Sequence, residues 1–119
     1  GKIKVGTVID EPFWSPDLMV ACVALAGAKL PLGVVFDGKN PLPLLTQNAK
    51  SPHGSFYFQF RNHAALRLGQ WKIVREKPVQ PWQLFNLKDD ISESKNLAKK
   101  QPAQVEKLKA AFAAWGKSF

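Results

Sequence analysis

Apolar residues near the end of the chain recur at the spacing of an α-helix. Four of them lie three or four positions apart: Val105, Leu108, Phe112 and Trp115. This spacing places them on one face of a helix, while Pro102 suits its first turn and Gly116 suits its end. The pattern predicts an amphipathic helix over residues 102–115 whose apolar face packs on another element.

The middle of the chain carries the signals of β-strands. Four short segments alternate in polarity or are rich in apolar residues: 56–60, 64–68, 71–75 and 82–87. A period of two is typical of strands, and the glycine of Gly69-Gln70 suits a tight hairpin turn between the second and third segments. We therefore predict an α+β fold, in which a small antiparallel sheet of three to four strands is covered by the C-terminal helix.

A separate helix with no polar face is predicted near the N-terminus. Ser15-Pro16-Asp17 is a typical helix start, in which Ser15 can cap the first turn, and Gly27 is a typical stop. Apolar side chains cover the whole circumference of this helix, at about residues 16–26. Such a helix is normally buried on every side, and 119 residues can hardly surround it. We therefore expect part of its packing partner to lie outside this chain, whose first residues also look like the middle of a longer one.

Composition excludes several classes of protein. The longest apolar run, Leu18 to Ala28, is too short to span a bilayer, which needs about 20 residues. A single cysteine excludes an internal disulfide framework and a zinc site built from several cysteines. Residues 30–54 are rich in proline and glycine, which predicts an irregular loop with one helical turn near residues 42–45.

The chain is basic, with 17 Lys and Arg against nine Asp and Glu and a formal net charge of +8. Such a balance is typical of proteins that bind nucleic acid, anionic polymers or membrane surfaces. The basic residues, however, are spread from Lys2 to Lys117, whereas a nucleic-acid site concentrates them beside stacking aromatic residues. The scatter favours a solvated surface, so we expect no nucleic-acid or membrane partner, and a preference for anionic substrates stays open.

Five segments match, in order and spacing, motifs of one known family. Residues 17–27 are similar to D-L-x-P-T-x-x-x-L-A-G, and residues 37–45 to D-G-x-x-L-x-P-L-L. Residues 65–74 are similar to A-I-R-x-G-D-W-K-L-V, and residues 83–97 to E-L-Y-D-L-x-x-D-P-x-E-x-x-N-L. The closing helix that ends at Trp115 also fits. Together these segments resemble the C-terminal portion of the sulfatase family, the arylsulfatase-like enzymes that hydrolyse sulfate esters.

The chain departs from the family pattern at positions that carry no chemistry in it. Val20 and Ala21 stand where the family has Pro-Thr, and Gln70 replaces an aspartate in the hairpin turn. Gln83 and Asn86 replace two acids of the E-L-Y-D-L segment. These changes affect capping and turn contacts, so the resemblance implies the same fold.

The resemblance implies a reaction whose catalytic residues this chain lacks. Sulfatases use a formylglycine made from Cys or Ser within C/S-x-P/A-x-R, and a Ca²⁺ ion that neutralises the sulfate oxygens. Cys22 is the only cysteine, and Ala26 stands where that motif needs arginine. We expect Cys22 to be buried in its helix, because a reactive thiol needs an accessible, electropositive setting. The catalytic and metal-binding residues are expected before Gly1, and the chain alone is expected to be inactive.

Polar residues near the predicted strands give the candidates for substrate binding. His53, Arg61, Asn62 and His63 suit an anionic sugar or aryl sulfate. The loop at 61–63 joins two strands, and the resemblance implies that such loops of the C-terminal subdomain can border the family's active-site cleft. The alternative that they are ordinary exposed turn residues stays open.

Two further groups of residues have structural explanations. The acids Asp89, Asp90 and Glu93 are spaced for a capped turn and lack the pattern of a calcium loop. Trp14, which could stack on a sugar, is expected to be a packing residue.

The domain organisation follows from the resemblance. Residues 1–50, with the apolar helix and the loop, are expected to belong to the edge of a catalytic domain that is otherwise missing. Residues 51–119 are expected to form a C-terminal subdomain. The rest of the sulfatase catalytic domain is the expected partner, and the whole protein is expected to be periplasmic or secreted.

Two alternatives remain open at this point. The net charge suits a free-standing basic module that binds anionic polysaccharide or nucleic acid. An exposed apolar helix suits a protein that self-associates through it.

Overall fold

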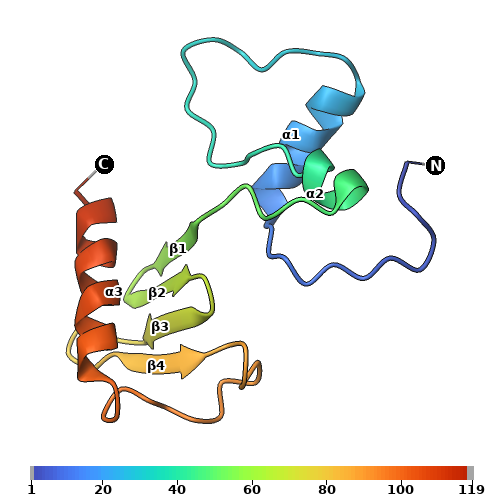
Figure 1. Cartoon of the computed structure of the whole chain (residues 1–119). Helices are drawn as coiled ribbons and strands as arrows, with labels where there is room; N and C mark the ends of the chain where they lie inside the picture. Colours follow the sequence, from blue (N-terminus) through green and yellow to red (C-terminus); the bar gives the residue numbers. More distant parts are fainter. Residues whose placement is uncertain (1, 118–119) are drawn as a thin grey trace. The chain divides into compact units, whose positions relative to one another are not determined.

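The computed structural model describes residues 2–117, which form two compact units divided between His53 and Gly54. Figure 1 shows the helices and strands of each unit. The helices and strands of the described residues follow in the order α1 (Ser15–Leu25), α2 (Leu42–Gln47), β1 (Ser55–Phe60), β2 (His63–Leu68), β3 (Trp71–Arg75), β4 (Gln83–Asn86) and α3 (Pro102–Trp115). The predicted helices and strands are therefore present, with small shifts of their ends.

The second unit contains one antiparallel sheet in which the strand order follows the chain, β1-β2-β3-β4. The register aligns one row of side chains across all four strands: Tyr57, Leu66, Ile73 and Leu84. Gly69 has a φ of +58° in the turn between β2 and β3, a conformation that glycine adopts without steric cost. The predicted hairpin at Gly69-Gln70 is confirmed.

Helix α3 packs on the face of the sheet that carries this row (Figure 1). Leu66, Ile73, Leu84 and Leu108 are each 0% exposed, and Val105 is 9% exposed. Burying such a side chain stabilises a fold by about 1.5–3 kcal/mol, so this cluster is the main source of stability in the unit. The predicted apolar face of the C-terminal helix is confirmed.

The three alternating phenylalanines of β1 lie on the other face of the sheet. The ring of Tyr57, on the opposite face, stacks on that of Trp115 in α3, with centroids 4.9 Å apart. Because successive strand residues point to opposite faces, Phe58 and Phe60 lie away from α3, and they are 48% and 68% exposed. The period of two therefore identified the strand but did not say which face is covered.

In the first unit, α1 begins at Ser15, the residue predicted to be its cap, and so one residue earlier than expected. Ser15 is the first helical residue and Trp14 is the N-cap, so the prediction that Ser15 caps the helix is wrong. The carboxylate of Asp17 accepts the N–H of Trp14 at 3.2 Å, and the carbonyl of Trp14 accepts the N–H of Asp17 at 3.0 Å. These two bonds close the first turn without a serine hydroxyl.

Much of α1 is exposed. Val20 and Ala21 are buried, whereas Leu18, Met19 and Leu25 are 52%, 45% and 60% exposed. Cys22 is exposed too, so its expected burial is wrong, because the described residues 2–53 leave that side of the helix uncovered. The expectation that the chain cannot surround its apolar helix is confirmed.

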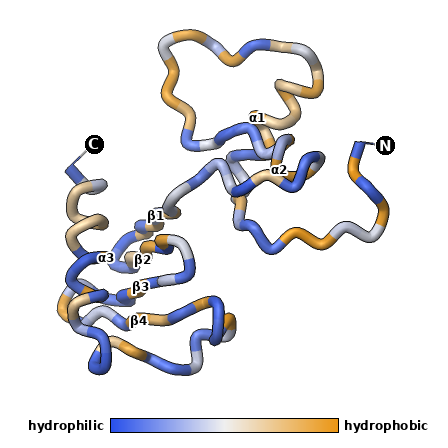
Figure 2. Tube along the Cα trace, viewed as in Figure 1, coloured by the Kyte–Doolittle hydropathy of each residue, from blue (hydrophilic) through white to orange (hydrophobic). Residues whose placement is uncertain are grey.

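The rest of the first unit is mostly irregular chain. The loop after α1 contains several apolar residues (Figure 2), among them Leu32 and Val35, which are 99% and 97% exposed. Helix α2 supplies the helical turn predicted near residues 42–45. Across residues 2–117, the longest and most apolar helices fall short of what crossing a membrane requires.

Candidate functional site

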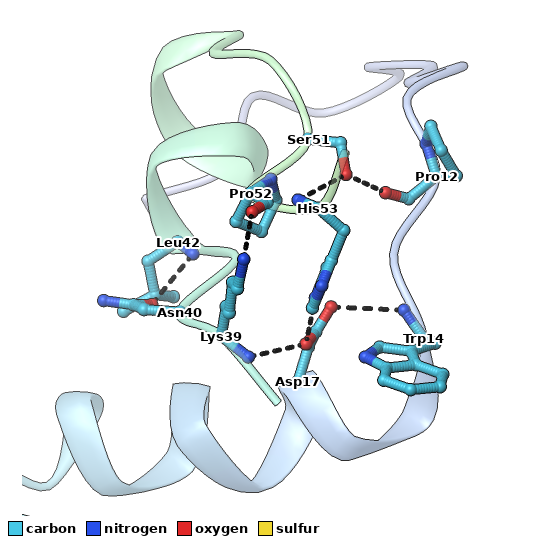
Figure 3. Close-up of polar contacts among 9 residues, drawn as sticks. All are labelled: Pro12, Trp14, Asp17, Lys39, Asn40, Leu42, Ser51, Pro52 and His53. Atoms are coloured by element: carbon cyan, nitrogen blue, oxygen red, sulfur yellow. Dashed lines mark hydrogen bonds and ion pairs between the residues drawn. The ribbon is translucent and has the colours of Figure 1, made fainter. Parts of the chain in front are cut away.

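The carboxylate of Asp17, in the first turn of α1, lies at the centre of a set of hydrogen bonds (Figure 3). Its side chain is 0% exposed. One oxygen accepts the N–H of Lys39 at 2.8 Å and lies 2.7 Å from Nε2 of His53, and the other accepts the N–H of Trp14. A buried carboxylate is tolerated when donors satisfy it in this way.

Asp17 holds together three segments that are distant in sequence. His53 comes from the end of the unit, and its ring meets that of Trp14 edge-on, with centroids 5.6 Å apart. This contact agrees with the packing role expected of Trp14. Lys39 comes from the loop before α2, and its ammonium group donates to the carbonyl of Pro52 at 3.1 Å. Gly38, next to it, lies so close to α1 that a Cβ there would be 2.3 Å from the carbonyl oxygen of Pro16.

A second set of bonds ties the segment before His53 to the N-terminal segment. The hydroxyl of Ser51 donates to the carbonyl of Pro12 at 2.6 Å and accepts the N–H of His53 at 3.2 Å. The carboxylate of Glu11 accepts the N–H of Ser51 at 3.1 Å and the ammonium of Lys50 at 2.7 Å. Hydrogen bonds therefore hold both the backbone N–H and the imidazole ring of His53.

The electrostatics keep Asp17 ionised. Burial raises the pKa of its carboxyl, but the hydrogen bonds from Lys39, His53 and Trp14 outweigh that effect, so the pKa lies below its usual value. The His53 side chain is only 5% exposed. Both side chains are therefore almost fully buried, and their contact joins α1 to the end of the unit.

The turn between β1 and β2 brings together three of the four predicted substrate-binding residues. Arg61 and Asn62 form the turn and His63 begins β2, and all three are exposed. Arg61 has a φ of +53°, which is uncommon for a residue with a side chain. Its guanidinium lies over the ring of Phe60, 5.2 Å from the centroid. The fourth residue, His53, belongs to the first unit and is held by Asp17, and the binding role of all four stays a prediction.

The acids after β4 form the capped turn that their spacing predicts. The carboxylate of Asp90 accepts the N–H groups of Ser94 and Lys95 at 3.1 and 2.8 Å. These bonds lower the pKa of Asp90 to about 2. Glu93 pairs instead with Lys72. Within residues 2–117, no three or more His, Cys, Asp or Glu side chains gather in a way that could hold a metal ion.

The polar network around Asp17 was missed by the sequence argument. Asp17 was interpreted only as an acid that favours the start of α1, and Lys39 was not singled out. The available signal was an acid three residues after Trp14, since an acid at the third helical position commonly bonds back to the cap residue. The bond to His53, 36 residues away, has no local signal.

Comparison with known sequences finds sulfatases. The chain is 35% identical to human steryl-sulfatase over 83 residues, which is 70% of this chain and 14% of that protein. It is 33% identical over 73 residues to an arylsulfatase of Hemicentrotus pulcherrimus, covering 60% of this chain and 13% of that protein. It is 28% identical over 98 residues to the mouse N-acetylgalactosamine-6-sulfatase, covering 82% of this chain and 19% of that protein. The chain thus spans less than a fifth of these relatives, and no family model matches it.

Solved structures give the same result. The fold matches the crystal structure of Ps i-CgsB with a TM-score of 0.67 and 33% identity, over 83% of this chain and 23% of that one. It matches BT33336S-sulf, described with the metabolism of multiple glycosaminoglycans by Bacteroides thetaiotaomicron, with a TM-score of 0.64 and 25% identity, over 82% of this chain and 24% of that one. BT1596, a 2-O GAG sulfatase, shares the fold at 22% identity, with a TM-score of 0.61 over 83% of this chain and 23% of that one.

Proposed function

Because this chain belongs to the sulfatase family, we propose that it completes the catalytic domain of a larger sulfatase, which hydrolyses sulfate esters. The share of the relatives that it matches supports this, since 13 to 19% of their length is too little for the whole enzyme. The basic binding module, the alternative suggested by the net charge, has no comparable support.

The exposed side of α1 is the observation that carries the proposal. Leu18, Met19 and Leu25 are about half exposed on a helix that has no polar face. A helix of this composition is stable in water when other apolar groups cover it. In the proposal, the rest of the sulfatase domain covers this side.

The chemistry of sulfate-ester hydrolysis is proposed to come from other parts of that protein. A formylglycine supplies the nucleophile in this family and Ca²⁺ neutralises the sulfate oxygens. The described residues do not fit either group, because no cluster of acids is available for a metal and Cys22 lacks the arginine of the formylglycine motif. We assign no catalytic step to this chain, and the chain alone is expected to be inactive.

The turn between β1 and β2 is proposed to border the substrate cleft. Arg61, Asn62 and His63 offer exposed hydrogen-bond donors, and the guanidinium of Arg61 suits a sulfate oxyanion. The uncommon φ of Arg61 adds support, since such conformations cluster at functional sites. We leave His53 out of the set that touches substrate, because its ring is enclosed by Asp17 and Trp14.

The proposed substrate class is a sulfated saccharide. Ps i-CgsB, which is 33% identical to this chain, has been crystallised with k-i-k-neocarrahexaose. BT33336S-sulf, at 25% identity, is described with glycosaminoglycan metabolism. A basic chain with an exposed cationic turn is compatible with such anionic substrates.

A chimera tests the structural role. Residues 2–117 would replace the matching segment of the Hemicentrotus arylsulfatase, and soluble yield and sulfate release from a chromogenic aryl sulfate would be measured. We expect the chimera to fold and turn over, and the same enzyme without the segment to do neither. The double variant Leu18→Asp/Leu25→Asp should abolish both, because it places two charges where apolar contacts are proposed.

A matched control separates this effect from general damage. Val79 and Ile91 are 91% and 77% exposed in the second unit, and the chimera with Val79→Asp/Ile91→Asp should keep its activity. Equal yield and activity of the two double variants would contradict the proposal that another part of the protein covers α1. Turnover by residues 2–117 alone would contradict the absence of catalytic residues.

A further inference from the structure

A polar hollow of about 240 Å³ lies in the second unit, away from the β1–β2 turn in sequence and on different strands. It is formed where β3 ends, β4 begins and the chain returns after the capped turn. Six residues line it: Arg75, Glu76, Gln80, Pro81, Gln83 and Asn96. Five of them have polar side chains, so a ligand in this hollow would meet mainly hydrogen-bonding groups.

Arg75 is the fixed cation of this hollow. Its guanidinium lies 4.6 Å from the centroid of the Trp82 ring, and Trp82 packs edge-on against Phe112 of α3 at 5.4 Å. The aromatic rings therefore hold the guanidinium in place before any ligand arrives, which lowers the entropy cost of binding.

The donors of Arg75 are poorly satisfied within the described chain. Its one hydrogen bond is to the carbonyl of Pro78 at a long 3.4 Å, and its buried Nε has no partner among residues 2–117. No Asp or Glu of the same residues lies within ion-pair distance of it. A partly buried guanidinium normally meets a carboxylate, sulfate or phosphate.

Amide side chains surround this cation. Gln80 and Gln83 form no side-chain hydrogen bond in the described chain. The side-chain oxygen Oδ1 of Asn96 accepts the N–H groups of Leu84 and Ala98 at 3.2 and 3.0 Å, which fixes the side chain and leaves its amide N–H groups for a ligand. Planar amides beside a guanidinium match the hydroxyls and the anionic group of a substituted sugar.

We propose that this hollow binds one sulfated sugar unit, with Arg75 meeting the sulfate and the three amides meeting ring hydroxyls. Glu76, which is exposed at the edge, accepts a further hydroxyl. The volume suits one monosaccharide rather than a polymer segment. The choice of a sulfated sugar rests on the proposed function. The hollow would act as a subsite that binds one sugar unit of the substrate at a distance from the ester bond that is hydrolysed.

Binding to the full chain tests this proposal without any activity assay. N-acetylglucosamine 6-sulfate, unsulfated N-acetylglucosamine and inorganic sulfate would be titrated separately, following backbone amide shifts by NMR. We expect the sulfated sugar to shift residues 75–83 and 96 and to bind about 10-fold more tightly than either other probe, because only it uses both the guanidinium and the amides.

Three variants assign the contacts. Arg75→Gln should weaken binding of the sulfated sugar about 10-fold, and Gln80→Ala should weaken it by a smaller factor while leaving inorganic sulfate unaffected. Arg67→Gln removes the same charge outside the hollow, where its Nε donates to Gly69, and should leave binding unchanged. Equal affinity for all three probes, or equal loss in Arg75→Gln and Arg67→Gln, would overturn the proposal. Because the chimera does not depend on this hollow, failure here leaves the proposed function standing.

Discussion

The two units of this chain are stabilised by opposite means. The second unit has a dry centre, in which Leu66, Ile73 and Leu108 are fully buried between a sheet and a helix. The first unit has a charged centre, in which the buried carboxylate of Asp17 joins α1 to Lys39 and His53. Its apolar residues are largely exposed instead.

The difference shows what each unit needs from its surroundings. An apolar core is worth about 25 cal/mol for each Å² that it removes from water and needs no further partner. A hydrogen-bonded buried carboxylate fixes the positions of its partners but adds little to the free energy of unfolding. The cost of removing the charge from water offsets most of the gain from its hydrogen bonds. The hydrogen bonds of the first unit therefore fix its conformation, but the unit buries few apolar side chains. This is expected of a segment that another part of a protein covers.

The largest effect is expected from shortening a side chain of the apolar core of the second unit. Leu108→Ala should lower the free energy of unfolding of the second unit by about 2–5 kcal/mol, while the amide shifts around Asp17 stay unchanged. Urea unfolding followed by NMR, residue by residue, measures both units in one sample. Leu32→Ala, at a side chain that is 99% exposed, should change neither, and equal loss in both units would show that they share one core.

Removing the charged centre should damage the first unit alone. Asp17→Ala leaves the N–H groups of Trp14 and Lys39 and the ring of His53 without their acceptor. We expect a loss of roughly 3 kcal/mol, at the upper end for unsatisfied buried donors, seen as faster amide exchange across α1. The control is Asp10→Ala, at an exposed position. Equal amide exchange rates of α1 in the two variants would contradict the hydrogen-bond network around Asp17.

Crowding the contact between the loop and α1 should have a somewhat smaller effect. Gly38→Ala would place a Cβ 2.3 Å from the carbonyl oxygen of Pro16, so the backbone must move, at a cost of about 1–3 kcal/mol. Gly54→Ala meets no atom within 4 Å and is expected to be neutral. Comparable stability of the two variants by thermal unfolding would mean that the loop does not lie against α1.

The smallest effect is expected from acid, which should weaken the contributions of Asp90 and Asp17 to the stability of their units. Asp90 has its pKa lowered to about 2 in the folded chain, against about 3.9 when unfolded. Its bonds therefore stabilise the fold fully above pH 4, and this contribution is lost as the pH falls from about 4 to 2. The pKa of Asp17 is lowered as well, so its contribution has the same sign.

Carboxyl NMR titration checks the pKa of Asp90 and the direction of the shift at Asp17. We expect the Asp90 signal to titrate near pH 2, and Asp90→Asn to flatten the pH dependence of the second unit between pH 4 and 2. A midpoint near the unfolded value would contradict the capped turn.

The sequence predicted the second unit well because its signals are local. Periods of two and of three to four, with Gly69 and Pro102 at the junctions, depend only on neighbours along the chain. The covered face of the sheet was not predictable, since Tyr57 and the phenylalanines of β1 are both suited to a core.

The first unit was less predictable, for a physical reason. The bonds of Asp17 to Lys39 and His53 span 22 and 36 residues, and no periodicity carries such pairings. Cys22 was expected to be buried because its helix is apolar all round, but burial depends on what lies next to the helix as well as on the helix itself. Of the candidate binding residues, adjacency in sequence was enough to group Arg61, Asn62 and His63.

The strand order β1-β2-β3-β4 has a consequence for how the molecule is made. Each strand finds its neighbour across a short connection, so closing the sheet costs little loop entropy, and topologies of this kind assemble rapidly. During synthesis, the second unit can acquire its native hairpins without help from distant segments. The second unit can therefore complete its sheet and pack α3 on it from segments that lie close together in sequence.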